Sequence, residues 1–84
     1  MARIIDGKAS NMVGDKVREL RMAKKMSQKL LSEKLETYAV YICRGSISRI
    51  EEKRRTVTDI ELYGLAQVLG VDIGDFFYET PVGL

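Results

Sequence analysis

The chain has 84 residues, 45% of them hydrophobic and 31% charged, which predicts one small folded domain rather than a disordered chain. Its net charge of +2 conceals an asymmetry, because all fourteen Lys and Arg residues lie at or before Arg55 and residues 56–84 carry five acids and no base. The chain has no histidine, one cysteine, no apolar tract long enough to span a membrane and a charged N-terminus unlike a signal peptide. We therefore expect a cytoplasmic protein with no catalytic site, no metal and no cofactor.

The first part of the chain predicts an arm followed by two amphipathic helices. Residues 1–11 show no hydrophobic periodicity, so we expect a mobile or loosely docked arm. The first helix is expected over residues 12–25. The second is expected over residues 27–36, because the hydroxyl of Ser27 can cap its first turn. The residues predicted on the apolar faces of these two helices are Val13, Val17, Leu20, Leu31 and Leu35.

A long turn over residues 36–43 leads to a third helix, expected over residues 44–52. Ile47 and Ile50 lie three residues apart and should turn toward the core. A helix with one thin apolar stripe can enter the major groove of DNA, where arginine binds the O6 and N7 of guanine or grips phosphate. The residues left on the outer surface of this helix are Arg44, Gly45, Ser46, Ser48 and Arg49.

Four further segments are predicted toward the C-terminus. Thr58 and Glu61 form a capping box that opens a fourth helix, which ends at Gly70. A short fifth helix is expected from Ile73 to about Tyr78, and residues 79–84 form a short tail. A basic connector joins the third and fourth helices and contains Lys53, Arg54 and Arg55.

The motifs in these segments occur in a characteristic order: Val17-Arg18-Glu19-Leu20-Arg21, Met26-Ser27-Gln28, Leu31, Leu35, Ile47-Ser48-Arg49-Ile50-Glu51 and Leu65-Ala66-Gln67-Val68-Leu69-Gly70-Val71. Together they resemble the phage repressor and Cro-type helix-turn-helix family, also called the xenobiotic-response-element type. The resemblance implies an all-α, five-helix, lambda-repressor-like domain over residues 1–84, with the helix-turn-helix at residues 27–52. The turn before the third helix is longer than usual, as in a subset of the family, and Lys53 stands where a glycine is often found.

The resemblance also implies which residues contact DNA. The base-reading positions of the family fall on Arg44, Gly45 and Arg49, and Gly45 would permit close approach instead of reading a base. Gln28 would hold a backbone phosphate at the positive end of its helix. Two alternatives stay open for Ser46 and Ser48, which either bind DNA or form hydrogen bonds back to the helix. The flanking phosphates would be bound by Lys53, Arg54 and Arg55.

Other residues have structural or undecided roles. Arg21 and Glu51 are implied to form a partly buried ion pair between the first and third helices. Cys43 precedes the third helix and is either a small semi-buried residue or a redox-sensitive thiol.

The sequence thus predicts a small, repressor-like transcriptional regulator that binds double-stranded DNA sequence-specifically. We expect a homodimer, because one recognition helix reads only a few base pairs. An alternative is an antitoxin or anti-repressor-type module that uses the same fold to bind a protein partner. The C-terminal apolar residues that favour a dimer or a partner contact there are Phe77, Tyr78, Val82 and Leu84.

Overall fold

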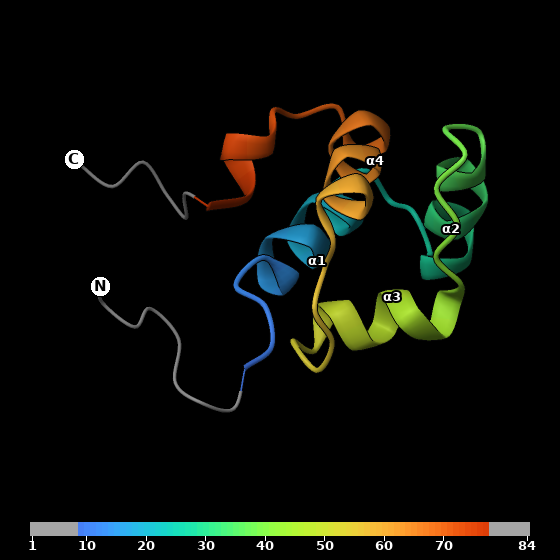
Figure 1. Ribbon diagram of the computed structural model, residues 1–84. Helices are drawn as coiled ribbons and strands as arrows, with labels where there is room; N and C mark the ends of the chain where they lie inside the picture. The colour runs from blue at the N-terminus through green and yellow to red at the C-terminus, as the bar shows by residue number, and fades with distance from the viewer. Residues whose placement is uncertain (1–8, 78–84) are drawn as a thin grey trace.

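The computed structural model describes residues 9–77, which form an all-helical unit without strands (Figure 1). None of the helices in this range has the length and apolarity needed to cross a membrane. The α-helices are α1 (Gly14–Ala23), α2 (Gln28–Glu36), α3 (Arg44–Glu51) and α4 (Asp59–Leu69), and the 3-10 helix η1 (Ile73–Phe77) follows them.

The expected fifth α-helix is therefore wrong, since the segment forms the 3-10 helix η1. The segment has only five residues and contains Gly74, so it forms too few hydrogen bonds to offset the cost of nucleating an α-helix. The carboxylate of Asp75 accepts a hydrogen bond from the backbone N–H of Asp72 at 3.0 Å and closes its first turn. Tyr78 and the tail over 79–84 lie outside the described residues.

One hydrophobic core lies between the helices. α3 packs against α1 and α2 at the lower side of the view in Figure 1, and α4 packs against α1 and α2 from above. Phe76 of η1 closes the core. The buried apolar side chains are Val13, Val17, Met26, Leu31, Leu35, Val40, Ile42, Ile47, Ile50, Leu65, Ala66, Leu69 and Phe76.

Local side-chain chemistry fixes the ends of α2 and α4. The Oγ of Ser27 accepts a hydrogen bond from the backbone N–H of Leu30 at 2.9 Å. At the start of α4, Thr58 and Glu61 form the reciprocal capping box, with bonds of 3.1 and 3.0 Å. Gly70 ends α4 with φ +71°, a conformation that costs glycine little. These caps are the ones that the sequence predicts.

The long turn between α2 and α3 is packed against the body of the domain. Its returning segment runs beside α2, where the hydroxyl of Ser32 donates to the carbonyl of Ile42 at 2.7 Å. Val40 is buried against Gly64 of α4, and a Cβ at position 64 would lie only 2.7 Å from Val40 Cγ2. The absence of a side chain at Gly64 thus lets the turn reach the core.

Candidate nucleic-acid interface

Helix α3 presents two chemically different faces. Ile47, Ile50 and Glu51 are buried against α1 and α2. Arg44, Gly45 and Arg49 are exposed on the outer surface, and Ser46 and Ser48 are half-buried at its margins. The helix therefore offers solvent a surface of two arginines with a glycine between them, which lets another molecule approach its backbone closely.

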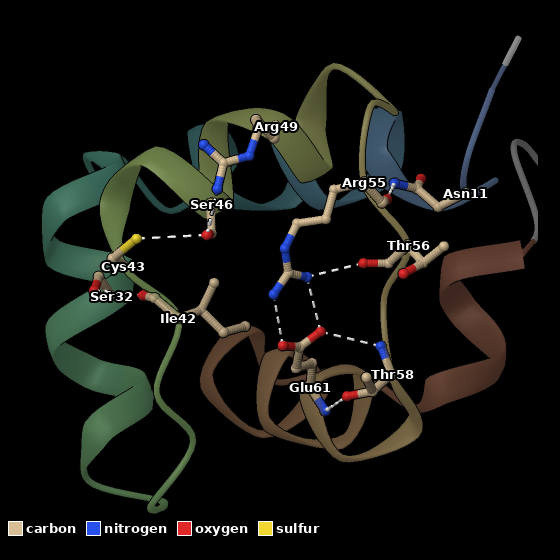
Figure 2. A network of polar contacts seen from close by, with 10 residues as sticks. All are labelled: Asn11, Ser32, Ile42, Cys43, Ser46, Arg49, Arg55, Thr56, Thr58 and Glu61. Atoms are coloured by element: carbon tan, nitrogen blue, oxygen red, sulfur yellow. Dashed lines mark hydrogen bonds and ion pairs between the residues drawn. The ribbon is translucent and has the colours of Figure 1, made fainter.

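The two arginines of α3 differ in how they are held. The Nη2 of Arg49 donates a hydrogen bond of 2.9 Å to Ser46 Oγ, whereas the side chain of Arg44 has no such partner within residues 9–77. Figure 2 shows Ser46 between Arg49 and Cys43, whose Sγ lies 3.4 Å from the same Oγ. This hydrogen bond with Ser46, together with backbone N–H groups at the start of α3, lowers the pKa of the exposed Cys43 thiol.

A buried polar network fixes α3 to the rest of the domain. Arg21 of α1 donates to both carboxylate oxygens of Glu51, with distances of 2.7 and 3.0 Å. The hydrogen bond to Glu51 raises the pKa of Arg21, which also donates to the carbonyl of Met26 at 2.7 Å. The side-chain amide of Gln28 donates to Glu51 Oε1 at 3.1 Å. The residue expected to hold a phosphate is thus bonded to this network, and its contact with DNA stays a prediction.

The basic connector after α3 begins with two residues in surface ion pairs. Lys53 has φ +60°, the left-handed conformation usually taken by glycine, and its Nζ lies 2.9 Å from the carboxylate of Asp15. Arg54 pairs with Glu52 at 2.9 Å, and its side chain is 67% exposed. Arg54 therefore lies at the surface just beyond the end of α3, and its contact with a phosphate stays a prediction.

Arg55 faces the other way, toward α4. Its guanidinium donates to both carboxylate oxygens of Glu61, at 2.9 and 2.8 Å, and to the carbonyl of Thr56 at 2.8 Å (Figure 2). The hydrogen bond between the two side chains raises the pKa of Arg55 and lowers the pKa of Glu61. The structure thus places Arg55 in an intramolecular pair, and a phosphate contact by this residue stays a prediction.

Asn11 lies in the segment expected to be a mobile or loosely docked arm, and it holds the connector in place. Its Oδ1 accepts from the backbone N–H groups of Val13 and Gly14, at 3.0 and 2.8 Å. Its Nδ2 donates to the carbonyls of Ile50 and Arg55, at 3.1 and 2.8 Å. The described end of the arm is therefore docked, and residues 1–8 lie outside the described residues. The sequence signal was an asparagine just before a helix, which is a common N-cap residue.

The charge asymmetry of the sequence has a spatial counterpart. In Figure 1, α3 and the connector occupy the lower edge of the domain, while η1 and most of α4 lie on the opposite side. Helix α3, with Arg44 and Arg49, therefore lies apart from η1, which contains Asp75. Within residues 9–77 no group of three His, Cys, Asp or Glu side chains is arranged to hold a metal ion. The site consists of arginines and small polar groups on the outer face of one helix, α3.

Comparison with known proteins gives two results. A protein-family model described as helix-turn-helix matches residues 17–76. The crystal structure of the restriction-modification controller protein C.AhdI from Aeromonas hydrophila is similar, with a TM-score of 0.69 and 27% sequence identity. The alignment covers 79% of this chain and 92% of that one. No significant match was found among curated proteins.

Proposed function

The chain belongs to this helix-turn-helix family, and we propose that it is a repressor-like regulator of transcription that binds double-stranded DNA sequence-specifically. The observation that carries the proposal is the outer face of α3, where Arg44 and Arg49 are exposed around Gly45 while the opposite face is fixed in the core. The similarity to a restriction-modification controller protein supports a regulatory role.

The proposed complex has α3 in the major groove. Arginines on the outer face would bind guanine edges, and Arg54 would contact a phosphate beside the groove. Because Glu51 ties α3 to α1 through Arg21, the helix enters the groove as part of a rigid body. A rigid helix places its side chains with little loss of conformational entropy, which favours discrimination between sequences.

We also propose that the protein binds DNA as a two-fold dimer. A single recognition helix reads only a few base pairs, and a dimer would bind two half-sites about one helical turn apart, ~34 Å. Ile60 and Tyr63 of α4 are 66% and 51% exposed, and Ile73 and Phe77 of η1 are also exposed. Most of α4 and η1 lie on the opposite side of the domain from α3 in Figure 1, so a contact there would leave α3 free.

These exposed apolar side chains also support the alternative function, a module that binds a protein partner through α4 and η1. Salt dependence distinguishes the two. A DNA complex that releases counterions should weaken steeply as salt rises, whereas apolar contact with a protein responds much less.

The test begins with selection of bound duplexes from random DNA, followed by titration of the preferred duplex at several salt concentrations. The proposal expects an enriched sequence with two related halves and a steep fall of affinity with salt. Failure to enrich any sequence, together with no binding at low salt, would contradict it.

A further inference from the structure

The outer face of α3 contains a hydrogen-bonded cluster that connects one turn of the helix to the next. Ser46 lies three residues after Cys43 and three before Arg49, so all three side chains lie on adjacent turns of one face (Figure 2). The hydroxyl of Ser46 accepts from Arg49 Nη2 at 2.9 Å, and Cys43 Sγ lies on its other side at 3.4 Å. The serine side chain is thus held between two neighbours.

The bond to Ser46 fixes the direction of the Arg49 side chain. The guanidinium folds back along the helix, and a Cβ at position 45 would lie 3.8 Å from Arg49 Nη1. This is an ordinary van der Waals distance, so the guanidinium lies beside the helix at Gly45 and does not depend on the missing side chain there. Arg44, in contrast, has no hydrogen bond or ion pair within residues 9–77 to restrict its side chain.

The held guanidinium keeps most of its capacity to bind. A guanidinium carries five N–H donors, and the bond to Ser46 uses one of them. Two donors are enough for a bidentate contact with the O6 and N7 of guanine. A free arginine loses rotamer freedom when it binds, whereas one that is already oriented loses less. Exclusion of water by the DNA would further strengthen the bond between Arg49 and Ser46.

We propose that Ser46 is a positioning residue for DNA recognition, whose hydroxyl orients the Arg49 guanidinium for one base pair without itself contacting DNA. This inference rests on the proposed function. It assigns Ser46 a role in specificity that is distinct both from phosphate binding and from direct reading of a base. The prediction that follows is that removal of the hydroxyl affects sequence preference only while Arg49 is present.

The test is a double-mutant cycle with Ser46→Ala, Arg49→Ala and the double variant, and with Ser46→Thr as the conservative variant. Each protein is titrated on the duplex that the unsubstituted protein prefers and on duplexes that differ from it at single base pairs. A thermal midpoint equal to that of the unsubstituted protein shows that each variant is folded. Thr retains a hydroxyl at position 46, so it tests the hydroxyl directly.

The expected results are specific to one base pair. Arg49→Ala should reduce discrimination there by about 5- to 150-fold, the range that corresponds to one bidentate contact. Ser46→Ala should reduce discrimination at the same base pair by a smaller factor, about 3- to 10-fold, with little change in binding to scrambled DNA. Ser46→Thr should retain the discrimination at this base pair. Ser46→Ala should have no further effect on it when Arg49 is already Ala.

Other results would overturn the inference in distinguishable ways. An equal loss of affinity on all duplexes for Ser46→Ala would show that Ser46 binds phosphate. An effect of Ser46→Ala that persists in the Arg49→Ala background would show that Ser46 reads a base itself. Discrimination that depends on Arg49 but not on Ser46 would overturn the positioning role alone. Absence of any sequence preference in the unsubstituted protein would overturn both this inference and the proposed function.

Discussion

Arg21 and Glu51 form a bidentate ion pair that joins α1 to the last residue of α3, with N–O distances of 2.7 and 3.0 Å. The side chain of Glu51 is 2% exposed. A pair of this kind adds little net stability compared with apolar residues, but loss of one partner leaves the other charge buried. The role of this ion pair is to set the orientation of α3 relative to the core.

Glu51→Ala should therefore lower the free energy of unfolding by about 3 kcal/mol, because Arg21 would remain enclosed without its partner. Thermal or urea denaturation measures the change. Glu52→Ala is the matched control, since Glu52 is the next residue and is exposed, and its only ion pair within residues 9–77 is with the surface residue Arg54. Equal stability of the two variants would contradict the structural role of Glu51.

Asn11→Ala should lower the free energy of unfolding by about 2–3 kcal/mol. The substitution removes the side-chain acceptor of the backbone N–H groups of Val13 and Gly14, and the carbonyl of Arg55 loses the amide donor of Asn11. The carbonyl of Ile50 also loses this donor but keeps the backbone N–H of Lys53.

Ser10→Ala is the control for Asn11, because the hydrogen bond of Ser10 to Lys53 uses its backbone N–H and survives the substitution. The control should change stability by less than about 0.5 kcal/mol. If Asn11→Ala is as mild as Ser10→Ala in urea denaturation, the docking of this segment is incorrect.

Glu61→Gln should lower the free energy of unfolding at neutral pH and make that free energy change less as the pH falls. The variant keeps the capping box, since glutamine also serves there, but removes the charge paired with Arg55. Its cost at pH 7 should be about 1–2 kcal/mol. The pKa of Glu61 is lowered in the folded state, so its contribution is present above the unfolded pKa and is lost as pH falls through the folded pKa.

Thermal midpoints at pH 7 and in acid measure this effect. The difference between the native protein and Glu61→Gln should be large at pH 7 and should shrink in acid below the ordinary glutamate range. Glu33→Gln, which removes an exposed glutamate without an ion-pair partner in residues 9–77, should show no such trend. A difference that is constant with pH would contradict the ion pair.

The thiol of Cys43 reports independently on its contact with Ser46. Because that hydrogen bond lowers the pKa of Cys43, more thiolate is present near neutral pH than for an ordinary cysteine. The rate of alkylation by iodoacetamide, followed against pH, should therefore reach its midpoint below the usual thiol range. Ser46→Ala should move that midpoint upward. The chain has one cysteine, so the signal is unambiguous, and identical profiles would contradict the contact.

The features that the sequence predicts best depend on residues that are close to one another in the sequence. The Ser27 cap and the box between Thr58 and Glu61 involve atoms within one helical turn, so residue type and spacing determine them. The prediction of a fifth α-helix is wrong because a segment of five residues forms too few hydrogen bonds to offset the cost of helix nucleation.

The intramolecular partners of the predicted site residues could not be found in this way. Gln28 and Arg55 have the residue types of phosphate contacts, yet they bond to Glu51 and Glu61, carboxylates brought close by tertiary packing. Asn11 contacts carbonyls about forty residues away in the sequence. Such contacts follow from how the helices pack, and a local pattern of residue types does not determine them.

In the proposed complex α3 reads base sequence while the connector binds the DNA backbone. Arg49→Ala and Arg54→Ala separate these roles, because Arg49 lies on the outer face of α3 and Arg54 lies beyond its end. Arg49→Ala should cost about 1–3 kcal/mol on the preferred duplex and much less on a scrambled one. Arg54→Ala should weaken binding to both duplexes equally and reduce the slope of log affinity against log salt by about one.

The most direct measurement is a binding titration of these two variants and the native protein on both duplexes at several salt concentrations. We expect Arg49→Ala to lose its preference for the selected duplex, and Arg54→Ala to lose affinity equally on both duplexes with a smaller salt slope. Equal losses on both duplexes for Arg49→Ala, or unchanged DNA binding in both variants, would contradict this expectation.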